Sequence, residues 1–342
     1  ISKDAKDWYA LNNNRPIVSS DTISTSGGIR DPHILRGADG CYYIVATDMN
    51  TVKNGWKDNP GIVMMRSADL VHWSHSKIVL KEAYKNFADA YWVWAPQTIY
   101  DRKAKKHMVY FTLQRTGDGR KSLITYYAYA NNNFTGFESE PKVLFSAKYG
   151  SIDNDIIERN GVYHLFYKGN IKNAEGKEIQ NGIQMATAKK LTGPWKEDFK
   201  FIDAYANQKT GVEGSGVFPL NDGSGYVLMY DLYGSGRYEY QTSRDLKTFT
   251  QKPQSFRKDF APRHGTVIPI TASEMERLQK QWGYVMEHEY TAKGNPLFTH
   301  MHTADPAALV ENDTLWLFTG VDEPGQHGTY VMRKWAVFST TD

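Results

Sequence analysis

One short motif recurs along the chain and limits the possible folds more than any other feature. A serine, a variable position and an aspartate are followed, after a short spacer, by an aromatic residue. Copies occur at residues 1–8, 66–73 and 242–249, and a cut-off copy closes the chain at residues 338–342. Serine and aspartate side chains accept hydrogen bonds from nearby backbone N–H groups, so each copy predicts a turn at the end of a strand. Such a repeat indicates successive β units.

Between these turns the sequence repeats a rhythm of three strands. The first unit predicts strands at residues 29–36, 41–47 and 61–67, and a fifth unit opens at residues 263–270. The units between them predict strands at residues 94–100, 107–112, 123–130, 153–157, 162–167, 183–188, 213–220, 225–230 and 238–242. Short strands separated by Gly, Asn and Asp turns predict an all-β fold of the β-propeller type, in which the first strand of each blade lines the axis.

One segment has a helical pattern. Residues 271–282 are predicted to form a helix, with Ser273 as the N-cap and Glu276 completing a capping box.

Three acidic residues lie in first strands of these units. Asp31, Asp153 and Glu213 each lie in an apolar or glycine-bounded strand, where a carboxylate costs desolvation energy unless it is paired, hydrogen-bonded or functional. Radial repetition would bring the three groups to one point, and paired carboxylates are what glycosidic bond cleavage requires. The neighbouring Asp155 is interpreted as a structural acid.

Composition excludes several classes of protein. The net charge is only +3 and the basic residues are scattered, apart from a small cluster at residues 102–106, which argues against nucleic acid as a partner. Aromatic residues make up 13% of the chain, which suits strands and also suits platforms for sugar rings. The single cysteine, Cys41, excludes an internal disulfide. No apolar run has transmembrane length, so membrane insertion is not expected.

The motifs, in their order, resemble those of glycoside hydrolase family 43. These are five-bladed β-propeller enzymes that remove arabinofuranosyl, xylosyl or galactosyl units, and the resemblance runs from about residue 29 to residue 270, including the family's signature at Trp94-Ala95-Pro96. In that family the general base precedes a proline on the first blade, which matches Asp31. The acid that tunes the pKa of the catalytic acid matches Asp153, and the general acid, a Glu before Gly, matches Glu213.

The resemblance implies an exo-acting, inverting hydrolase of terminal sugar units on a plant-type oligosaccharide or polysaccharide. Asp31 would deprotonate a water while Glu213, kept protonated by burial and by the charge of Asp153, protonates the leaving oxygen. Inversion predicts a gap of roughly 6.5–9.5 Å between these two carboxyl groups. No cofactor is required by this chemistry.

Two alternatives stay open. A retaining fructan- or sucrose-type hydrolase should carry an Asn-Asp-Pro near its start and a Glu-Cys acid strand, whereas this chain has Glu213-Gly214. A non-catalytic carbohydrate-binding propeller is the other alternative, and three intact acids argue against it.

Further residues are candidates for contact with the substrate. Trp92 and Trp94 are expected to wall the sugar site or to pack in the core, and His33 shares a strand face with Asp31. Arg237 and Arg263 are candidates for sugar hydroxyls or for lowering a carboxylate pKa, with a surface salt bridge as the alternative for Arg237. The following candidates are therefore assigned to substrate binding: Trp92, Trp94, His33, Arg237, Arg263 and His264.

His264 has a second candidate role. The resemblance places it near the axis, where in some members a histidine helps to hold a structural calcium ion or a water cluster. A satisfied core histidine is the alternative reading.

The two ends of the chain depart from a simple family member. Residues 1–290 are predicted to form the catalytic propeller, and residues 291–342 resemble the opening blade of a family 43 domain, with Asp305 in the general-base position. They either complete the fifth blade or begin a second propeller, and the second reading is favoured. Asp305 has no local Glu-Gly partner, so it is not expected to be catalytic. We expect the protein to be secreted or periplasmic, although no signal peptide is visible at Ile1.

Overall fold

The structure is a computed structural model that describes residues 1–172, 178–205, 210–283, 301–324 and 330–341. The chain divides into two compact units, Ile1–Gly283 and Tyr284–Asp342. The domain boundary placed near residue 290 by the sequence falls within residues 284–300, outside the described residues.

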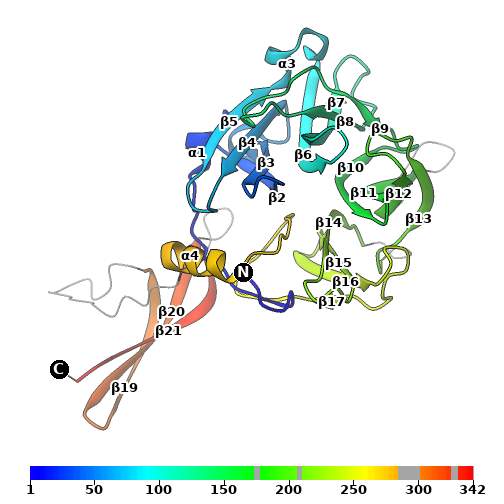
Figure 1. The fold of residues 1–342 in the computed structure, drawn as a ribbon. Coiled ribbons are helices and arrows are strands. Elements are labelled where there is room, and N and C mark those ends of the chain that lie inside the picture. The colour runs from blue at the N-terminus through cyan, green and yellow to red at the C-terminus, as the bar shows by residue number, and fades with distance from the viewer. Residues whose placement is uncertain (173–177, 206–209, 284–300, 325–329, 342) are drawn as a thin grey trace. The chain divides into compact units, whose positions relative to one another are not determined.

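Four antiparallel sheets of four strands make up most of the first unit (Figure 1). The first sheet consists of β2 (Ile29–Arg36), β3 (Tyr42–Asp48), β4 (Gly61–Ser67) and β5 (Ser74–Val79). The second consists of β6 (Ala90–Asp101), β7 (Lys106–Arg115), β8 (Ile124–Tyr129) and β9 (Lys142–Phe145). The third consists of β10 (Ser151–Arg159), β11 (Val162–Lys172), β12 (Glu178–Ala188) and β13 (Lys196–Phe201). The fourth consists of β14 (Glu213–Pro219), β15 (Tyr226–Leu232), β16 (Arg237–Ser243) and β17 (Gln254–Ser255).

The sheets lie around a common centre, with β2, β6, β10 and β14 innermost (Figure 1). Apolar side chains fill the space between each sheet and the next. Val45 and Ile62 of the first sheet share a cluster with Phe111 of the second, and Tyr110 of the second shares one with Leu165 of the third. Burial of these faces is what holds neighbouring sheets together.

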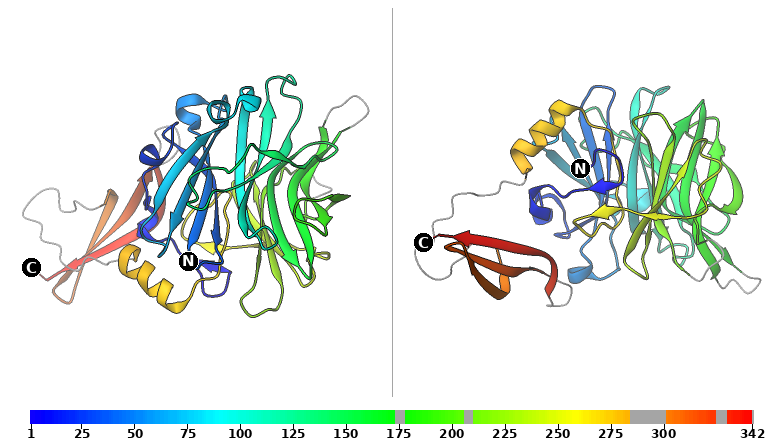
Figure 2. Two further views of the ribbon diagram at one scale, coloured as in Figure 1. Left: turned by 45° about the horizontal axis from the view of Figure 1, so that its top comes forward. Right: turned by 90° about the horizontal axis from the view of Figure 1, so that it is seen from below.

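Short elements complete this unit. They are β1 (Asp7–Trp8), which pairs in parallel with β18 (Arg257–Lys258), the short helices α1 (Ser20–Ile23), α2 (Thr51–Asn54) and α3 (Leu80–Ala83), and the 3₁₀ turns η1 (Asn12–Asn14) and η2 (Lys85–Phe87). The longest of the described helices is α4 (Ala272–Trp282), which lies beside the strands of the first sheet (Figure 2). None of the described helices is long and apolar enough to cross a membrane.

The repeated turns form as the sequence predicts. The carboxylates of Asp4, Asp69 and Asp245 each accept hydrogen bonds of 2.8–2.9 Å from the backbone N–H groups two and three residues later. The aromatic residues that follow, Trp73 and Phe249 among them, pack in hydrophobic clusters. The repeat is therefore a structural device that ends a strand and anchors the next segment.

Two local predictions are wrong. Residues 263–270 do not form a strand; Ile268 and Ile270 instead pack against Tyr42 and the end of α4. The first unit thus shows four four-stranded sheets among its described residues, and a fifth sheet does not open at residue 263.

The cap of α4 also differs from the prediction. Thr271, rather than Ser273, is the N-cap, and Glu274, rather than Glu276, completes the capping box. Glu274 is held there because it also pairs with Arg36 of β2, Nη2 to Oε2 2.6 Å, which fixes the helix to the first sheet.

The second unit contains one three-stranded antiparallel sheet. Its strands are β19 (Thr303–Glu311), β20 (Thr314–Pro324) and β21 (Tyr330–Thr340), in that order.

Candidate active site

A β-bulge interrupts the first strand of each sheet near its start. The register shifts between Arg30 and His33 in β2, between Ile152 and Asp155 in β10, and between Glu213 and Gly216 in β14. Asp31 and Asp153 stand inside these bulges with positive φ angles of 50° and 54°. A bulge re-aims a side chain out of the regular alternation of a strand, and here it directs the acids toward the same point.

His264 joins the three predicted acids. Its Nδ1 lies 3.1 Å from Asp31 Oδ1 and 3.9 Å from Asp153 Oδ1, and its Nε2 lies 3.4 Å from Glu213 Oε1. The carboxylates of Asp31 and Glu213 therefore face different nitrogens of one imidazole ring. The structure brings together four residues that the sequence nominated, from three separate sheets and the segment after the fourth.

Gly214 makes this arrangement possible. It has a φ of +66°, and a Cβ at this position would lie 2.5 Å from His264 Cδ2. A larger residue would push the imidazole away from Glu213 and would strain the backbone. The Glu-Gly pair of the sequence motif is explained by this close approach.

Asp31 is held as a carboxylate. Its Oδ2 accepts a hydrogen bond of 3.2 Å from Thr47 Oγ1, and Thr47 in turn accepts one of 2.9 Å from the Ala95 backbone N–H. Burial acts to raise the pKa of Asp31, but the contact with His264 and the charges of His264 and Arg30 outweigh it, so that this pKa is lowered. An ionised Asp31 is suited to act as a base.

Asp153 is almost fully buried and behaves differently. Its Oδ2 accepts a hydrogen bond of 3.0 Å from the Gly214 N–H, and its backbone carbonyl accepts one of 2.9 Å from Ser215 Oγ. Burial raises the pKa of Asp153 to about 6, against the attraction of His264 and with the repulsion of Glu213. Asp153 thus fixes the start of β14 and adds negative charge beside Glu213 as it ionises.

The pKa of Glu213 is lowered, contrary to the expectation that burial and the charge of Asp153 would keep it protonated. Burial acts to raise its pKa, but His264 and Lys168 lower it to about 2. Lys168 Nζ lies 3.0 Å from Glu213 Oε2, and Arg263 Nη2 lies 3.7 Å from Oε1. The sequence carried no sign of this because Lys168 on β11 and His264 in the segment after β18 offset both burial and the charge of Asp153.

Two residues of this site escaped the sequence reasoning. Lys168 comes from β11, and Asp231 comes from β15, where it stands opposite Glu213 in the register. Asp231 is 1% exposed and pairs with Arg263 Nε. An acid inside the apolar run Tyr226–Leu232 was a usable signal for Asp231. Lys168 had no such signal.

His33 and Asp155 form a separate buried pair. His33 Nε2 lies 3.9 Å from Asp155 Oδ1, and His33 Nδ1 accepts a long hydrogen bond of 3.4 Å from the Thr98 N–H. Burial lowers the pKa of His33 to about 3 and raises that of Asp155 to about 7. Asp155 Oδ2 also accepts a hydrogen bond of 2.6 Å from the Val217 N–H, which ties β10 to β14.

Trp92 and Trp94 form an aromatic platform at the start of β6. Their rings are stacked with centroids 3.9 Å apart, and Trp56 meets Trp94 edge-on at 5.9 Å. Arg30, next to Asp31 in β2, lies over the Trp56 ring at 4.8 Å. These partly exposed rings are therefore close to the strand that carries Asp31.

Arg237 lies elsewhere. Its described partners are Glu239, with Nη1 3.3 Å from Oε1, Ser235, whose Oγ accepts a hydrogen bond of 3.3 Å from Arg237 Nε, and the ring of Tyr205 at 5.8 Å. These contacts match the surface salt bridge that the sequence left as the alternative.

A cavity of about 20 Å³ lies among the acids. It is lined by Asp31, Pro32, Ala95, Gln97, Asp153, Gly214, Ser215, His264, Gly265 and Thr266. This volume is sufficient for about one water molecule next to Asp31 and is too small for a sugar ring.

The donor set does not fit calcium. Asp153, Glu213 and His264 place one ligand atom each within 4.8 Å of one another. Burial acts to lower the pKa of His264, but the surrounding carboxylates raise it well above its ordinary value, so the ring is a cation. Calcium takes six to eight oxygen ligands, whereas these three residues offer two carboxylates and one imidazole.

Comparisons with known proteins agree on the family. A family-43-related model described as a probable glycosyl hydrolase domain matches residues 1–276. An α-L-arabinofuranosidase from Bifidobacterium longum subsp. longum is 24% identical over 301 residues, which cover 75% of this chain and 27% of that protein. The chain therefore spans about a quarter of the length of this curated relative.

Solved structures show the same fold. The GH43_1 enzyme from Xanthomonas citri, in complex with xylose, is similar with a TM-score of 0.53 and 15% identity over 93% of this chain and 92% of that one. Its complex with xylotriose gives a TM-score of 0.51 at the same identity and coverage. With the family match over residues 1–276, the chain belongs to glycoside hydrolase family 43.

Proposed function

We propose that this protein removes terminal arabinofuranosyl, xylosyl or galactosyl units from plant-type polysaccharides, with inversion and outside the cytoplasm. The observation that carries the proposal is the convergence of Asp31, Asp153 and Glu213, from three sheets, on the single ring of His264. The arabinofuranosidase among the relatives makes an α-L-arabinofuranoside the first substrate to test, and the xylose complex of a structural neighbour makes a β-xyloside the second.

Asp31 is proposed as the general base. Its lowered pKa keeps it ionised at neutral pH, and the cavity beside it accommodates one water molecule. A carboxylate in contact with a confined water can take its proton as the oxygen attacks the anomeric carbon. Thr47 holds the second oxygen of Asp31 and fixes the direction of the first.

Glu213 is proposed as the general acid, which requires its pKa to rise when substrate enters. Burial alone raises that pKa, and the contacts with His264 and Lys168 are what lower it. A sugar that inserts its hydroxyl groups between Glu213 and these two cations removes the lowering contacts and leaves the effect of burial. The carboxyl group then takes up the proton that it delivers to the leaving oxygen.

The first unit is proposed to be the five-bladed catalytic propeller. Between the fourth and first sheets lie β1, β18, residues 263–270 and α4, and their side chains pack on both neighbouring sheets. These segments occupy the place that a fifth blade would take.

Residues 291–342 are proposed to begin a second propeller. Asp305 in β19 has a φ of 51° and stands in a register shift between Ala304 and Ala307, as Asp31 does in β2. Strands β2 and β19 each have a bulge at an aspartate that is followed by a proline. This similarity supports β19 as the first strand of a new propeller rather than a strand that completes the fifth blade.

A panel of aryl glycosides tests the activity directly. Aryl α-L-arabinofuranoside, β-D-xyloside and β-D-galactoside should be compared, with the Asp31→Asn variant as the matched control for each. Release of phenol from one of them by the native chain, and its loss in the variant, would support the proposal. No turnover of any of the three by a folded protein would contradict it.

A further inference from the structure

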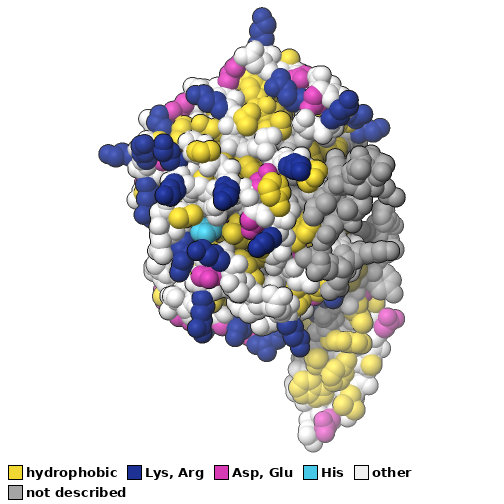
Figure 3. Space-filling model, turned by 90° about the vertical axis from the view of Figure 1, so that its right-hand side faces the viewer, with side chains coloured by type: hydrophobic (Ala, Val, Ile, Leu, Met, Phe, Trp, Pro, Cys, Tyr) yellow, Lys and Arg dark blue, Asp and Glu magenta, His cyan; other side chains and the backbone are white. Residues whose placement is uncertain are grey.

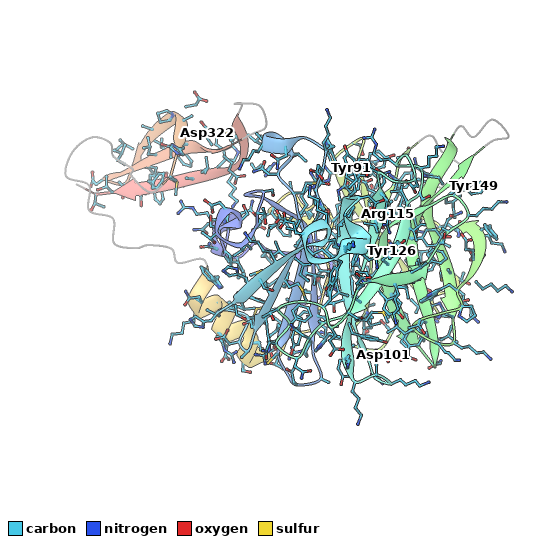
Figure 4. All side chains as sticks on the ribbon, turned by 90° about the horizontal axis from the view of Figure 1, so that it is seen from above. Tyr91, Asp101, Arg115, Tyr126, Tyr149 and Asp322 are labelled. Atoms are coloured by element: carbon cyan, nitrogen blue, oxygen red, sulfur yellow. The ribbon has the colours of Figure 1, made fainter. Side chains whose placement is uncertain are left out.

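A second and larger cavity lies at the end of the third sheet opposite to the end that carries Asp153. The inner strands begin at the end that carries Asp153, whereas Arg159 ends β10 and Val162 begins β11. Figure 4 shows the two ends on the second sheet, with Tyr91 and Arg115 near one and Asp101 at the other. The cavity has a volume of about 550 Å³. It is lined by Arg159, Asn160, Val162, His164, Met185, Thr187, Lys196, Glu197, Asp198 and Lys247.

Its walls come from two sheets. Lys196 begins the outer strand β13 of the third sheet, and Lys247 follows the turn after β16 of the fourth. The face of the molecule that carries the third sheet is rich in Lys and Arg side chains, with a histidine visible among them (Figure 3). The cavity is thus a cleft between neighbouring sheets, away from the carboxylate cluster.

Three cations line this cavity, and one of them, Arg159, also interacts with the charge of Asp245. Within the described part of the chain, Arg159, Lys196 and Lys247 form no ion pair. The two acids of the wall are engaged in other contacts: Glu197 Oε1 accepts a hydrogen bond of 3.0 Å from Tyr167 Oη, and Asp198 Oδ1 accepts one of 3.1 Å from the Lys200 N–H. The wall therefore carries three cations against two carboxylates, and the small excess of positive charge suits an anion.

A buried histidine adds an independent sign of a ligand. His164 is 4% exposed and lines the cavity, yet its Nδ1 has no hydrogen-bond partner. Burial and the charges of Arg159 and Lys247 lower its pKa, so the ring is neutral. Buried polar atoms are normally hydrogen-bonded, and a neutral imidazole at a cavity wall is suited to a hydroxyl group.

The size and the apolar wall point to a sugar rather than to a small ion. Ligand pockets commonly measure 300–1,000 Å³, and a cavity of about 550 Å³ is much larger than an inorganic anion needs. Val162 and Met185 supply an apolar surface against which a sugar ring can lie. The cations can bind a carboxylate, the neutral imidazole can bind a hydroxyl group, and the apolar wall can pack against a sugar ring. A sugar that carries a carboxylate has all three of these features.

We propose that this cleft binds a uronic acid unit of an acidic polysaccharide, with the carboxylate held by Arg159, Lys196 and Lys247. The inference deepens the proposed function, on which it rests for the choice of a polysaccharide, by adding a holding site remote from the catalytic carboxylates. If the charged units of the polysaccharide bind in this cleft at one end of the protein, the neutral terminal units stay close to the catalytic carboxylates at the other end of the protein.

Calorimetric titration of the full chain tests the site without using activity. The probes are methyl α-D-galactopyranosiduronate and methyl α-D-galactopyranoside, which differ only in the carboxylate. We expect the uronate to bind at least about tenfold more tightly than the neutral sugar, with an affinity that falls as salt is added. Equal affinities, or no binding of the uronate, would overturn the proposal.

Variants locate the binding. Lys196→Gln combined with Lys247→Gln should weaken uronate binding by about tenfold or more, whereas Lys200→Gln, on the same strand but outside the cavity, should not change it. Thermal unfolding verifies that all variants fold, and Lys247→Arg should restore most of the affinity lost in a Lys247→Gln variant. An unchanged affinity in the double variant would place the sugar elsewhere and refute the assignment.

Two further measurements distinguish uronate binding in this cleft from binding at the catalytic site and from simple anion binding. Asp31→Asn should leave uronate binding intact, so failure of the proposed hydrolase function and failure of this site are distinguishable. Inorganic phosphate is the second probe. If phosphate binds as tightly as the uronate and displaces it, the cleft is a simple anion site and the sugar proposal is wrong.

Discussion

Lys168 Nζ lies 3.0 Å from Glu213 Oε2, so a lysine from the third sheet holds the proposed catalytic acid of the fourth sheet in its ionised form. Lys168 also lies over the ring of Tyr233, with Nζ 4.6 Å from the centroid. The lysine is only 17% exposed, so its charge acts on Glu213 with little screening by solvent. This pair sets the protonation state from which the reaction must start.

Lys168→Met should raise the pKa of Glu213 in the free enzyme, because one of the two lowering cations is removed. More of the enzyme then carries a protonated acid at a given pH, so the alkaline limb of kcat/KM should move to higher pH. The measurement is a pH profile with an aryl glycoside, and Lys142→Met, at an exposed position of β9, is the control. A profile that does not move would deny Lys168 this role.

Glu213→Ala should slow substrates with poor leaving groups by about 10²–10⁴-fold, because these need protonation as the bond breaks. Activated aryl glycosides should be affected much less, since their leaving groups depart as anions. Steady-state rates on a series of leaving groups of graded pKa would measure this. An equal loss across the series would remove the claim of Glu213 to be the general acid.

His264→Gln should destabilise the protein in a pH-dependent way. The pKa of His264 is raised in the folded state by the surrounding carboxylates. Its stabilising contribution is therefore fully present below the unfolded pKa of about 6.5 and is lost as the pH rises through the folded pKa. The loss in the free energy of unfolding should be larger near about pH 6 than near about pH 10.

Denaturant titrations at both pH values measure this difference, and the exposed His72→Gln is the matched control. If the destabilisation is the same at both pH values, His264 is not a cation shared by the acids.

The inner strands could be predicted from the sequence because each joins an apolar pattern to a turn signal. The strand predicted at residues 29–36 is found as β2 over the same residues. The fourth strand of each sheet was missed, since strands such as β5 and β13 are mostly exposed and lack an apolar alternation. The apolar residues of 263–270 suggested a strand, but this segment pairs with none of the described strands: Ile268 and Ile270 pack by their side chains against Tyr42 and α4.

The positions of the acids in the site could be predicted from the sequence, but their protonation states could not. Asp31 and Asp153 stand at the same position of their bulges, and Glu213 stands one residue earlier relative to its own, so their convergence followed from the repeat. The contact between Lys168 and Glu213 depends on how two sheets pack, which no local pattern encodes.

Asp305→Asn should change glycosidase activity by no more than about twofold, as expected for a residue outside the reacting groups. Asp31→Asn should lower it by about 10²–10⁴-fold, because the general base is lost. The two variants make the same chemical change at strands with the same bulge. Matching losses in both would show that Asp305 takes part in catalysis.

The stereochemistry of the first product tests the central claim, that Asp31 activates a water while Glu213 protonates the leaving group. A proton NMR time course on the preferred aryl glycoside follows the anomeric signals before mutarotation mixes them. We expect the first sugar released to have the anomeric configuration opposite to that of the substrate, since water attacks from the face opposite the leaving group. A first product with the retained configuration would contradict this account, because it would require a carboxylate to act as nucleophile.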